Sequence, residues 1–293
     1  MPIPFDILAQ DTHGITLKVT KGGYTLNLAA NKIFEHPILI KFKPTGKNLN
    51  FKLSVTVGKN AKATIIEEWA SDVRPATINY DVRVAANEKS DLRWVTVQNV
   101  AKTSIMNENR KTTVGNKAEV DIYSFNFGAK RLESHFEQNV GAEAECNLTS
   151  VAKTEGSQHF DIICDELFGA KSGRGEIRCK GVAQDTSSLK FGGLLTIQKT
   201  AGGTQAYLKQ ETLNLSSKAK VNATPALNIK TNDVKAGHGA SIRNLNPEEL
   251  FYLASRGINE KMGKKMLTES FLEDALSELS DLPEIQNKIR QLI

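Results

Sequence analysis

One histidine lies where the sequence changes from an extended pattern to a helical one. His238 stands between Gly237 and Gly239, and Ala236 and Ala240 are also small, so the imidazole has little steric cover. Neutral imidazole is a good ligand for iron and other transition metals, and glycines allow an unusual φ or a close backbone approach. The same residues are also consistent with a histidine that caps the end of a β structure through backbone hydrogen bonds. His238 is therefore a candidate metal ligand, with a structural cap as the alternative.

The other residues with useful chemistry are dispersed. Cys146, Cys164 and Cys179 are an odd number without CxxC spacing, which argues against a disulfide framework and favours buried small residues in separate strands. His159 and Asp161 share one face of a strand, where a surface pair explains them better than metal binding does. The sequence has no G-x-S-x-G, P-loop or H-E-x-x-H motif, so we expect no catalytic constellation.

The composition excludes several classes of protein. The net charge of +5 comes from 38 basic and 33 acidic residues that are interspersed, and aromatics make up 6%, which disfavours nucleic-acid binding. No run approaches 18 apolar residues, so no membrane span is expected. The start, MPIPFDILAQDTHG, lacks a basic segment followed by an apolar one, so we expect no secretory signal. The cysteine usage favours a reducing cytoplasm.

Residues from about 12 to about 243 have the pattern of short strands. GITLKVT, GGYTLNLA, NLNFKLSVTVG, AEVDIYSFNFG and KVNATPALNIKT alternate apolar and polar residues between turn-forming ones. A parallel sheet of the βαβ type requires crossover helices, and no helical period interrupts these residues. The pattern therefore predicts a mainly β fold.

A weak repeat indicates how the strands are arranged. VGKNAKA at Val57, VGNKAEV at Val114, VGAEAEC at Val140 and LSSKAKV at Leu215 are similar, ANEKSDL at Ala86 fits more loosely, and most gaps are close to multiples of about 25 to 29 residues. Each unit is a strand end, a polar turn and a small residue that enters the next strand. This favours a β-solenoid, whose coils stack on one continuous core. A β-sandwich is the alternative, although its turns lack such self-similarity.

The pattern becomes helical at Asn246. In NPEELFYLASRG, Asn246 is at the N-cap, Pro247 at the first helical position, Glu249 at the third and Gly257 just past the end. This is a capping box with proline first and glycine last. The spacing predicts a helix between these signals.

Two further helices follow the first. One is predicted from Asn259 to about Leu279, and a short third one opens at Pro283. The predicted domains are therefore a β-helix over residues 1–245, least certain over residues 1–20, and a helical domain over residues 246–293. The second helix rests on apolar residues that recur at three to five positions, namely Met262, Met266, Phe271, Ala275 and Leu279.

Several stretches resemble the SufB/SufD family of iron–sulfur cluster assembly proteins. DVKAGHGASIRNLNPEELFYLASRGI is similar to the C-terminal signature of that family, GKNAKATIIEEW to its turn and strand ending in an acidic pair and Trp, and QHFDI to a later strand. The stretch that begins CKGVAQDTSSLKFGG and runs to PALNI follows the later strands almost without gaps. The resemblance covers most of the chain from about residue 20 and is strongest from Gly181 to Ile258.

The resemblance implies a right-handed parallel β-helix flanked by helices. It also implies a scaffold subunit without enzymatic activity, which pairs with a paralogue and two copies of the ATPase SufC, and a transient iron–sulfur cluster or iron at the paralogue interface. The isolated chain is expected to bind neither a cluster nor iron tightly. In this setting His238 supplies one ligand and a cysteine of the partner another. The contact with SufC is placed in the helical tail, at Leu250, Phe251, Tyr252, Arg256, Met262 and Met266.

The sequence departs from the family pattern at defined positions. Gln210 stands where SufB proteins carry a cysteine, Ala236 where many SufD proteins have one, and LFGAKSGRG where many members have histidines. The N-terminal helical region of long members has no counterpart. The first two departures argue against a SufB role and against a thiolate site supplied by this chain alone. The preferred interpretation is a SufD-like subunit. A homodimeric scaffold that acts with SufC alone is one alternative. A β-solenoid carbohydrate-active enzyme, which needs clustered carboxylates and an aromatic sugar platform, is another.

Overall fold

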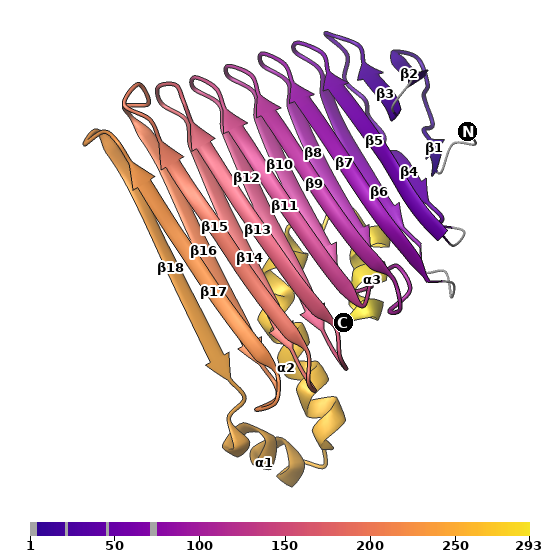
Figure 1. Ribbon diagram of the computed structural model, residues 1–293, viewed down its shortest axis with the longest axis vertical. Helices are drawn as coiled ribbons and strands as arrows, with labels where there is room; N and C mark the ends of the chain where they lie inside the picture. Colours follow the sequence, from indigo (N-terminus) through magenta and orange to yellow (C-terminus); the bar gives the residue numbers. More distant parts are fainter. Residues whose placement is uncertain (1–4, 21–22, 45–46, 71–74) are drawn as a thin grey trace.

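The computed structural model describes residues 5–20, 23–44, 47–70 and 75–293, and over these it is a β-solenoid of about seven turns (Figure 1). The strands form two nine-stranded sheets, which we call sheet A and sheet B. Sheet A contains, in order, β1 (Phe5–Leu8), β4 (Ile38–Phe42), β6 (Lys62–Trp69), β8 (Asp91–Gln98), β10 (Glu119–Asn126), β12 (Glu145–Thr154), β14 (Arg174–Ala183), β16 (Thr204–Asn214) and β18 (Val234–Asn244). Sheet B contains β2 (Ile15–Thr20), β3 (Gly23–Leu28), β5 (Lys47–Val57), β7 (Ala76–Ala86), β9 (Ile105–Val114), β11 (Arg131–Val140), β13 (His159–Phe168), β15 (Ser188–Ile197) and β17 (Lys220–Ile229).

Successive coils stack in parallel and in register. The coils differ in length: a short one leads from Glu119 to its partner Glu145, and a longer one leads from Ser188 to its partner Lys220. Among the described strands, antiparallel pairing occurs only at the N-terminal end, between β1 and β4 and between β2 and β3. The prediction of a parallel β-solenoid rather than a sandwich is confirmed. The last coils are longer than the repeat that the turn sequences predict.

The repeated sequence units are turns that stack at one edge of the solenoid. Asn60, Lys89, Lys117 and Glu143 occupy the same place in successive turns from sheet B to sheet A, each with a φ between 53° and 58°. The backbone N–H of each one donates a hydrogen bond to the turn of the next coil. LSSKAKV, which starts at Leu215, is different, because it joins sheet A to sheet B at the opposite edge. The other repeat units thus correspond to one stacked turn, and the grouping of LSSKAKV with them was wrong.

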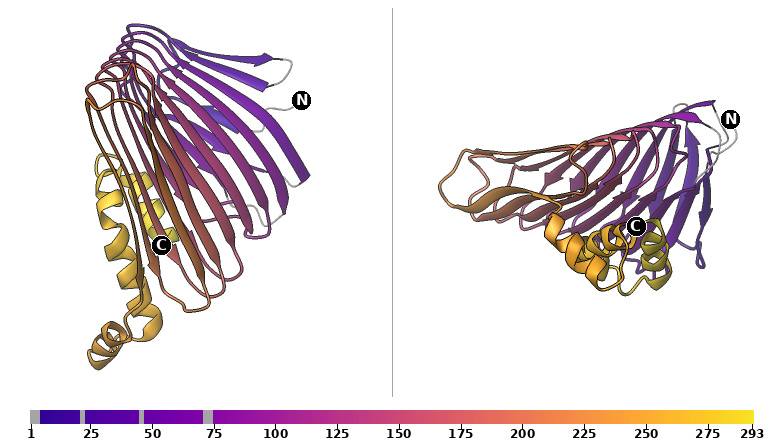
Figure 2. Two further views of the ribbon diagram at one scale, coloured as in Figure 1. Left: turned by 60° about the vertical axis from the view of Figure 1, so that its left-hand side comes forward. Right: turned by 90° about the horizontal axis from the view of Figure 1, so that it is seen from below.

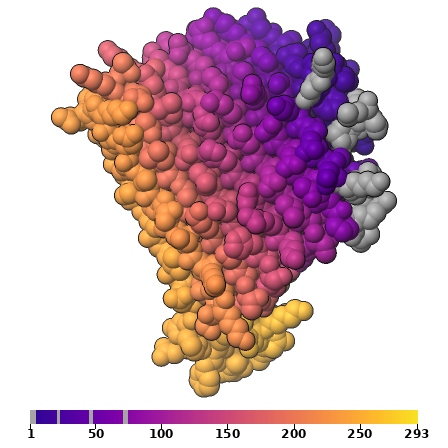
Figure 3. Space-filling view, viewed as in Figure 1, coloured from indigo at the N-terminus to yellow at the C-terminus, as the bar shows by residue number. Residues whose placement is uncertain are grey.

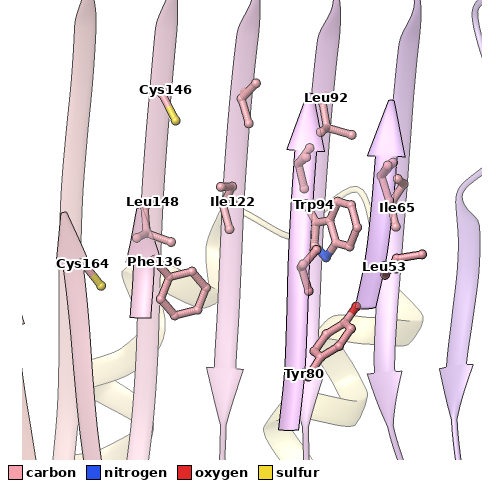
Figure 4. Packing of buried hydrophobic residues seen from close by; sticks show 14 of the residues in the cluster. Leu53, Ile65, Tyr80, Leu92, Trp94, Ile122, Phe136, Cys146, Leu148 and Cys164 are labelled. Carbon is pink, nitrogen blue, oxygen red and sulfur yellow. The ribbon is translucent and has the colours of Figure 1, made fainter. Parts of the chain in front are cut away.

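The interior is filled by rows of side chains that lie one above another in successive coils. Parallel, in-register pairing places paired residues on the same side of a sheet. One row of sheet A therefore consists of large apolar side chains, three of which are seen in Figure 4 as Trp94, Ile122 and Leu148. Each buried side chain of this size contributes roughly 1.5–3 kcal/mol relative to an exposed one. The alternating pattern of the sequence is thus explained by this core.

The helices begin and end at the predicted signals. In the described part of the chain these helices are α1 (Pro247–Ser255), α2 (Glu260–Ser277) and α3 (Pro283–Leu292). The Asn246 side chain accepts a hydrogen bond from the backbone of α1 at 3.0 Å, and Gly257 has a φ of +81°. Glu249 does not complete the capping box, because its carboxylate pairs with Arg243. None of these helices is both long enough and apolar enough to cross a lipid bilayer.

The helices α2 and α3 cover the outer face of sheet A (Figure 2). Leu272, Ala275, Leu276 and Leu279 are buried there in a second hydrophobic core, whereas Met262 and Met266 of the predicted apolar stripe are exposed. The partners on the sheet include Val95, Val97, Phe125, Val151, Val182 and Leu213. The strands therefore end and the helices begin near residue 245, and both contribute side chains to this second core. The division into two domains stays a prediction.

Among the described residues no helix covers the outer face of sheet B, and Figure 3 shows this face as a continuous surface. Residues 5–20, the least certain part of the predicted β domain, supply β1 and β2 at the N-terminal ends of the two sheets. Residues 1–4 lie outside the described residues.

Candidate functional site

The solenoid ends in two strands that have a neighbour on one side only. Strand β17 pairs with β15 and strand β18 with β16, and no other described segment lies against their outer edges. Neither strand contains a buried residue, although the preceding strands alternate buried and exposed ones. Such an edge presents a row of backbone donors and acceptors that can pair with another chain. We call this surface, formed by β17 and β18, the open end (Figure 1).

His238 lies in the open end, in the middle of β18. It pairs with Leu208, which points into the core, so His238 continues the apolar row that contains Trp94, Ile122 and Leu148. The side chain is exposed because β18 is the last strand of the row. The imidazole is exposed as expected, but the cause is the end of the stack and not the small size of its neighbours. The imidazole belongs to the inward-facing row of the last coil, and a molecule that continued the stack would add the next residue of this row.

A metal site at His238 needs further ligand side chains around the imidazole. Among the described residues, no group of three His, Cys, Asp or Glu side chains is placed to hold a metal ion. Gln210, at the position where the family pattern has a cysteine, is completely buried next to Cys179 on β14 and Ala240 on β18. Its amide makes no hydrogen bond to another described residue. The role of His238 as a metal ligand therefore stays a prediction.

All three cysteines are buried, as predicted. Burial raises the pKa of the Cys146 thiol well above its ordinary value. The pKa of Cys164 is also raised, first by its hydrogen bond with Cys179 and then by burial. Thiols with a raised pKa and no exposure are poor nucleophiles and poor metal ligands in the native state.

A buried charged cluster inside the first coils was not anticipated. Glu67 accepts hydrogen bonds from the indole N–H groups of Trp69 and Trp94, at 2.7 and 2.8 Å, and from Arg110 at 2.7 Å. Arg110 also donates to Glu108 at 2.9 Å and lies over the Trp94 ring at 4.7 Å. Burial alone would lower the pKa of Arg110, but the two carboxylates raise it above its usual value. The acidic pair before Trp69 was the only signal of this cluster in the sequence.

The position of the tryptophans weighs against a carbohydrate-active site. The outer face of sheet B has a hollow of about 480 Å³ lined by Asp81, Glu133, Asp161 and His135, among others. Both tryptophans lie in the core and are at most 2% exposed. The carboxylates are thus present on one face, but the indoles cannot supply a platform for a sugar ring.

The helix α1 projects beyond the solenoid and carries large exposed apolar groups (Figure 2). Phe251 is 77% exposed and Tyr252 is 59% exposed, and the Arg256 guanidinium lies 5.5 Å from the Tyr252 ring. Met262 and Met266 are exposed near the start of α2. We call these five residues the helical patch.

Leu250, the sixth residue predicted for partner docking, has a different environment. It is half-buried, and its Cδ2 atom and Leu253 Cδ1 would lie 3.3 and 3.2 Å from a Cβ atom added at Gly263 of α2. Glycine thus permits a close approach of α1 and α2. Leu250 contributes to this helix packing, and the exposed patch lies beside it.

Comparisons with known proteins agree with the sequence motifs. The model of the family "SUF system FeS cluster assembly, SufBD core domain" matches residues 43–271. The chain is 25% identical over 280 residues to an iron–sulfur cluster assembly SufBD family protein of Synechocystis, with 91% of this chain and 62% of the relative covered.

Two similar proteins are named SufD. The protein of Bacillus subtilis is 25% identical, with 92% of this chain and 64% of the relative covered, and that of Escherichia coli is 24% identical, with 79% and 55% covered. The chain thus spans less than two thirds of the length of these relatives.

Proposed function

The chain belongs to the SufBD family of the SUF system for iron–sulfur cluster assembly, and from this premise we propose that it acts as a SufD-like scaffold subunit. It pairs through the open end with a SufB-like paralogue and holds a SufC-type ATPase on the helical patch. It turns over no substrate of its own and acts in the cytoplasm. A nascent cluster or iron, which is cargo of the complex, forms where the two paralogues meet.

The open end is the observation that carries this proposal. The last two strands, of 10 and 11 residues, have unpaired edges and no buried side chain. A solenoid end exposes apolar surface and needs a cap, and strand edges are satisfied when a second chain adds its own strands. Pro225, which has no backbone donor, lies on the edge strand β17, where proline is tolerated. A second solenoid of the same family has the matching shape.

The chemistry of the open end supports a shared iron site. His238 is the inward-facing residue at the centre of β18, and the nearby positions Gln210 and Ala236 carry no thiol. Imidazole and thiolate are both good iron ligands. This chain therefore supplies one nitrogen ligand, and a SufB-like partner supplies thiolates. A homodimer would bring two histidines and no thiolate from these positions.

The helical patch suits a protein partner. Exposed aromatic and methionine side chains next to an arginine are enriched in protein interfaces. The other side of α2 packs in the core on sheet A, and the large exposed apolar side chains of the helices lie on α1 and at the start of α2. Deletion of residues 246–293 would uncover that core, and substitutions in the patch are therefore the better test.

The first test is the composition of the complex. The chain is co-expressed with a SufB-like protein and a SufC-type ATPase, and the intact assembly is weighed by native mass spectrometry. We expect one copy of this chain with one SufB-like chain and the ATPase. A complex that contains two copies of this chain and no SufB-like chain would support the homodimeric scaffold instead.

The second test separates a ligand role of His238 from a structural role. We expect His238→Ala to lower iron and sulfide per complex severalfold and to leave thermal stability and assembly nearly unchanged, because the side chain is exposed. His159→Ala, which removes an exposed histidine from the first residue of β13, is the control. Unchanged iron together with a stability loss of about 1–2 kcal/mol would show that His238 is a cap.

The third test concerns the ATPase. Phe251→Ser combined with Tyr252→Ser should reduce co-purification of the ATPase and its stimulation by the chain, with an unchanged far-UV spectrum. Leu194→Ser, at a residue that is 36% exposed on sheet B, is the control. Full recovery of the ATPase with the double variant would exclude the helical patch as its docking site.

A further inference from the structure

Two of the three thiols meet across the interior of one coil. Cys164 lies on β13 in sheet B and Cys179 on β14 in sheet A, and their Sγ atoms are 3.9 Å apart. Both side chains are 0% exposed. The two residues are only 15 positions apart in the sequence, because one turn joins the strands. Cys146, in the preceding coil, has no thiol contact among the described residues.

The two thiols are in contact but not bonded, and a bond between them requires both sulfurs to move. A disulfide has an S–S length of about 2.05 Å, so the two sulfurs need to approach by roughly 1.9 Å in total. Rotation about the Cα–Cβ bonds of the two cysteines would move both sulfur atoms.

Cys179 lies in a row between Ser150 and Gln210 of the adjacent strands. Both neighbours have buried polar atoms without a hydrogen bond to other described residues.

We propose that Cys164 and Cys179 are a modification site, at which an intramolecular disulfide joins sheet A to sheet B within one coil. The bond forms when the chain folds in the presence of a low-molecular-weight disulfide such as oxidised glutathione. One cysteine thiolate attacks a glutathione sulfur, and one glutathione leaves. The second cysteine attacks the protein sulfur of this mixed disulfide, and the second glutathione leaves. Two protein thiols are oxidised, one small disulfide is reduced, and the two thiol protons end on the released glutathiones.

The surroundings favour a disulfide over a metal bound by two thiolates. Asp165 and Glu108 add to the effects of the Cys179 hydrogen bond and of burial that raise the pKa of Cys164. A dithiolate site would place further negative charge among these groups at a high desolvation cost. A disulfide is neutral, so it carries no such desolvation cost.

Burial also determines when the bond can form. Glutathione cannot reach sulfurs that are 0% exposed in the native chain. The exchange therefore takes place while β13 and β14 come together, before the neighbouring coils cover them. Once formed, the bond is protected from reduction by the same burial.

The test traps the thiols after folding under two redox conditions. Wild type, Cys146→Ser and Cys179→Ser are refolded from urea with oxidised and reduced glutathione, and are also produced in a bacterial strain with an oxidising cytoplasm. Remaining thiols are alkylated, and the chain is digested with trypsin without reduction. We expect residues 154–171, which include Cys164, to be linked to the dipeptide of residues 179–180. The same link should form in Cys146→Ser.

The stability of the trapped protein provides a second readout. Closing a loop of this length lowers the unfolding equilibrium constant on the order of 100-fold, so oxidised wild type and Cys146→Ser should resist more urea than their reduced forms. Cys179→Ser should show no such gain. Absence of the linked peptide under both conditions, links to Cys146 in comparable amounts, or a linked chain that is less stable than the reduced one would each overturn the proposal. The readouts use the isolated chain, so failure of the scaffold proposal would leave them unaffected.

Discussion

Glu166 should make the protein less stable as the pH rises, and replacing it with glutamine should remove this effect. Its side chain lies in an inner row of β13 and is 2% exposed. The Oε2 atom makes no hydrogen bond to another described residue, and a Cβ atom added at the neighbouring Gly175 would lie 2.5 Å from it. Burial raises the pKa of Glu166 well above its usual value. The carboxyl group is therefore protonated in the native state at a pH where the unfolded chain is ionised.

The sign and the magnitude follow from proton linkage. A carboxyl whose pKa is raised by folding stabilises the native state fully below the unfolded pKa of about 4.3, and this contribution is lost as the pH rises toward the folded pKa. Each pH unit in this window costs up to about 1.4 kcal/mol. Between pH 5 and pH 7, Glu166 should therefore lower the free energy of unfolding by up to about 2.7 kcal/mol.

The assay compares urea unfolding at pH 5 and pH 7. Glu166→Gln keeps the shape and is neutral at both values, so the variant should lose less stability over this interval than the wild type, by up to about 2.7 kcal/mol. Any packing cost of the amide enters equally at both pH values and cancels. Glu176→Gln, at an exposed position of β14, should retain the pH dependence of the wild type. Equal pH dependence of the wild type and Glu166→Gln would refute the reasoning.

Three other changes test the packing of the fold. Leu276→Ala should cost about 2–5 kcal/mol in urea unfolding, because the side chain is fully buried between α2 and sheet A, whereas Met262→Ala at the exposed patch should cost less than about 0.5 kcal/mol; equal costs would contradict this packing. Arg110→Leu should destabilise the chain by about 3–5 kcal/mol, since it leaves two buried carboxylates without their cationic partner, and a neutral effect would show that the ion pairs do not stabilise the fold. Asn246→Ala should raise amide exchange in the first turn of α1 and reduce local stability by about 1 kcal/mol, and unchanged exchange would exclude the cap.

Much of the fold was predictable because the signals are local. Alternation with a period of two identifies strands with one buried face, and the recurring turn gives the coil length where the turn sequence is similar. The three helices were located because Asn246, Asn259 and Pro283 start them and Gly257 ends the first. These residues act through hydrogen bonds and dihedral angles within one turn, which the chain determines without long-range information.

The candidate site was only partly predictable. His238 was identified from its glycine neighbours and the resemblance. Five of the six residues predicted for partner docking are exposed, and the sixth, Leu250, is half-buried. The side of the sheet on which His238 lies depends on its pairing with Leu208 in the preceding coil. That register depends on the length of the coil between them, which the strand pattern does not specify.

The sequence by itself determined that this chain forms strands, turns and capped helices of a SufBD-type solenoid. Only the tertiary structure decided which side chains meet in the interior. Arg110 on β9 reaches Glu67 on β6 in the opposite sheet, and Cys164 faces Cys179 across the two sheets. Coils of unequal length stack side chains in rows, so a change of one residue in coil length would place different groups side by side. The physical reason is that alternation fixes the face of each residue, whereas its neighbours along the solenoid are fixed by the summed lengths of the turns.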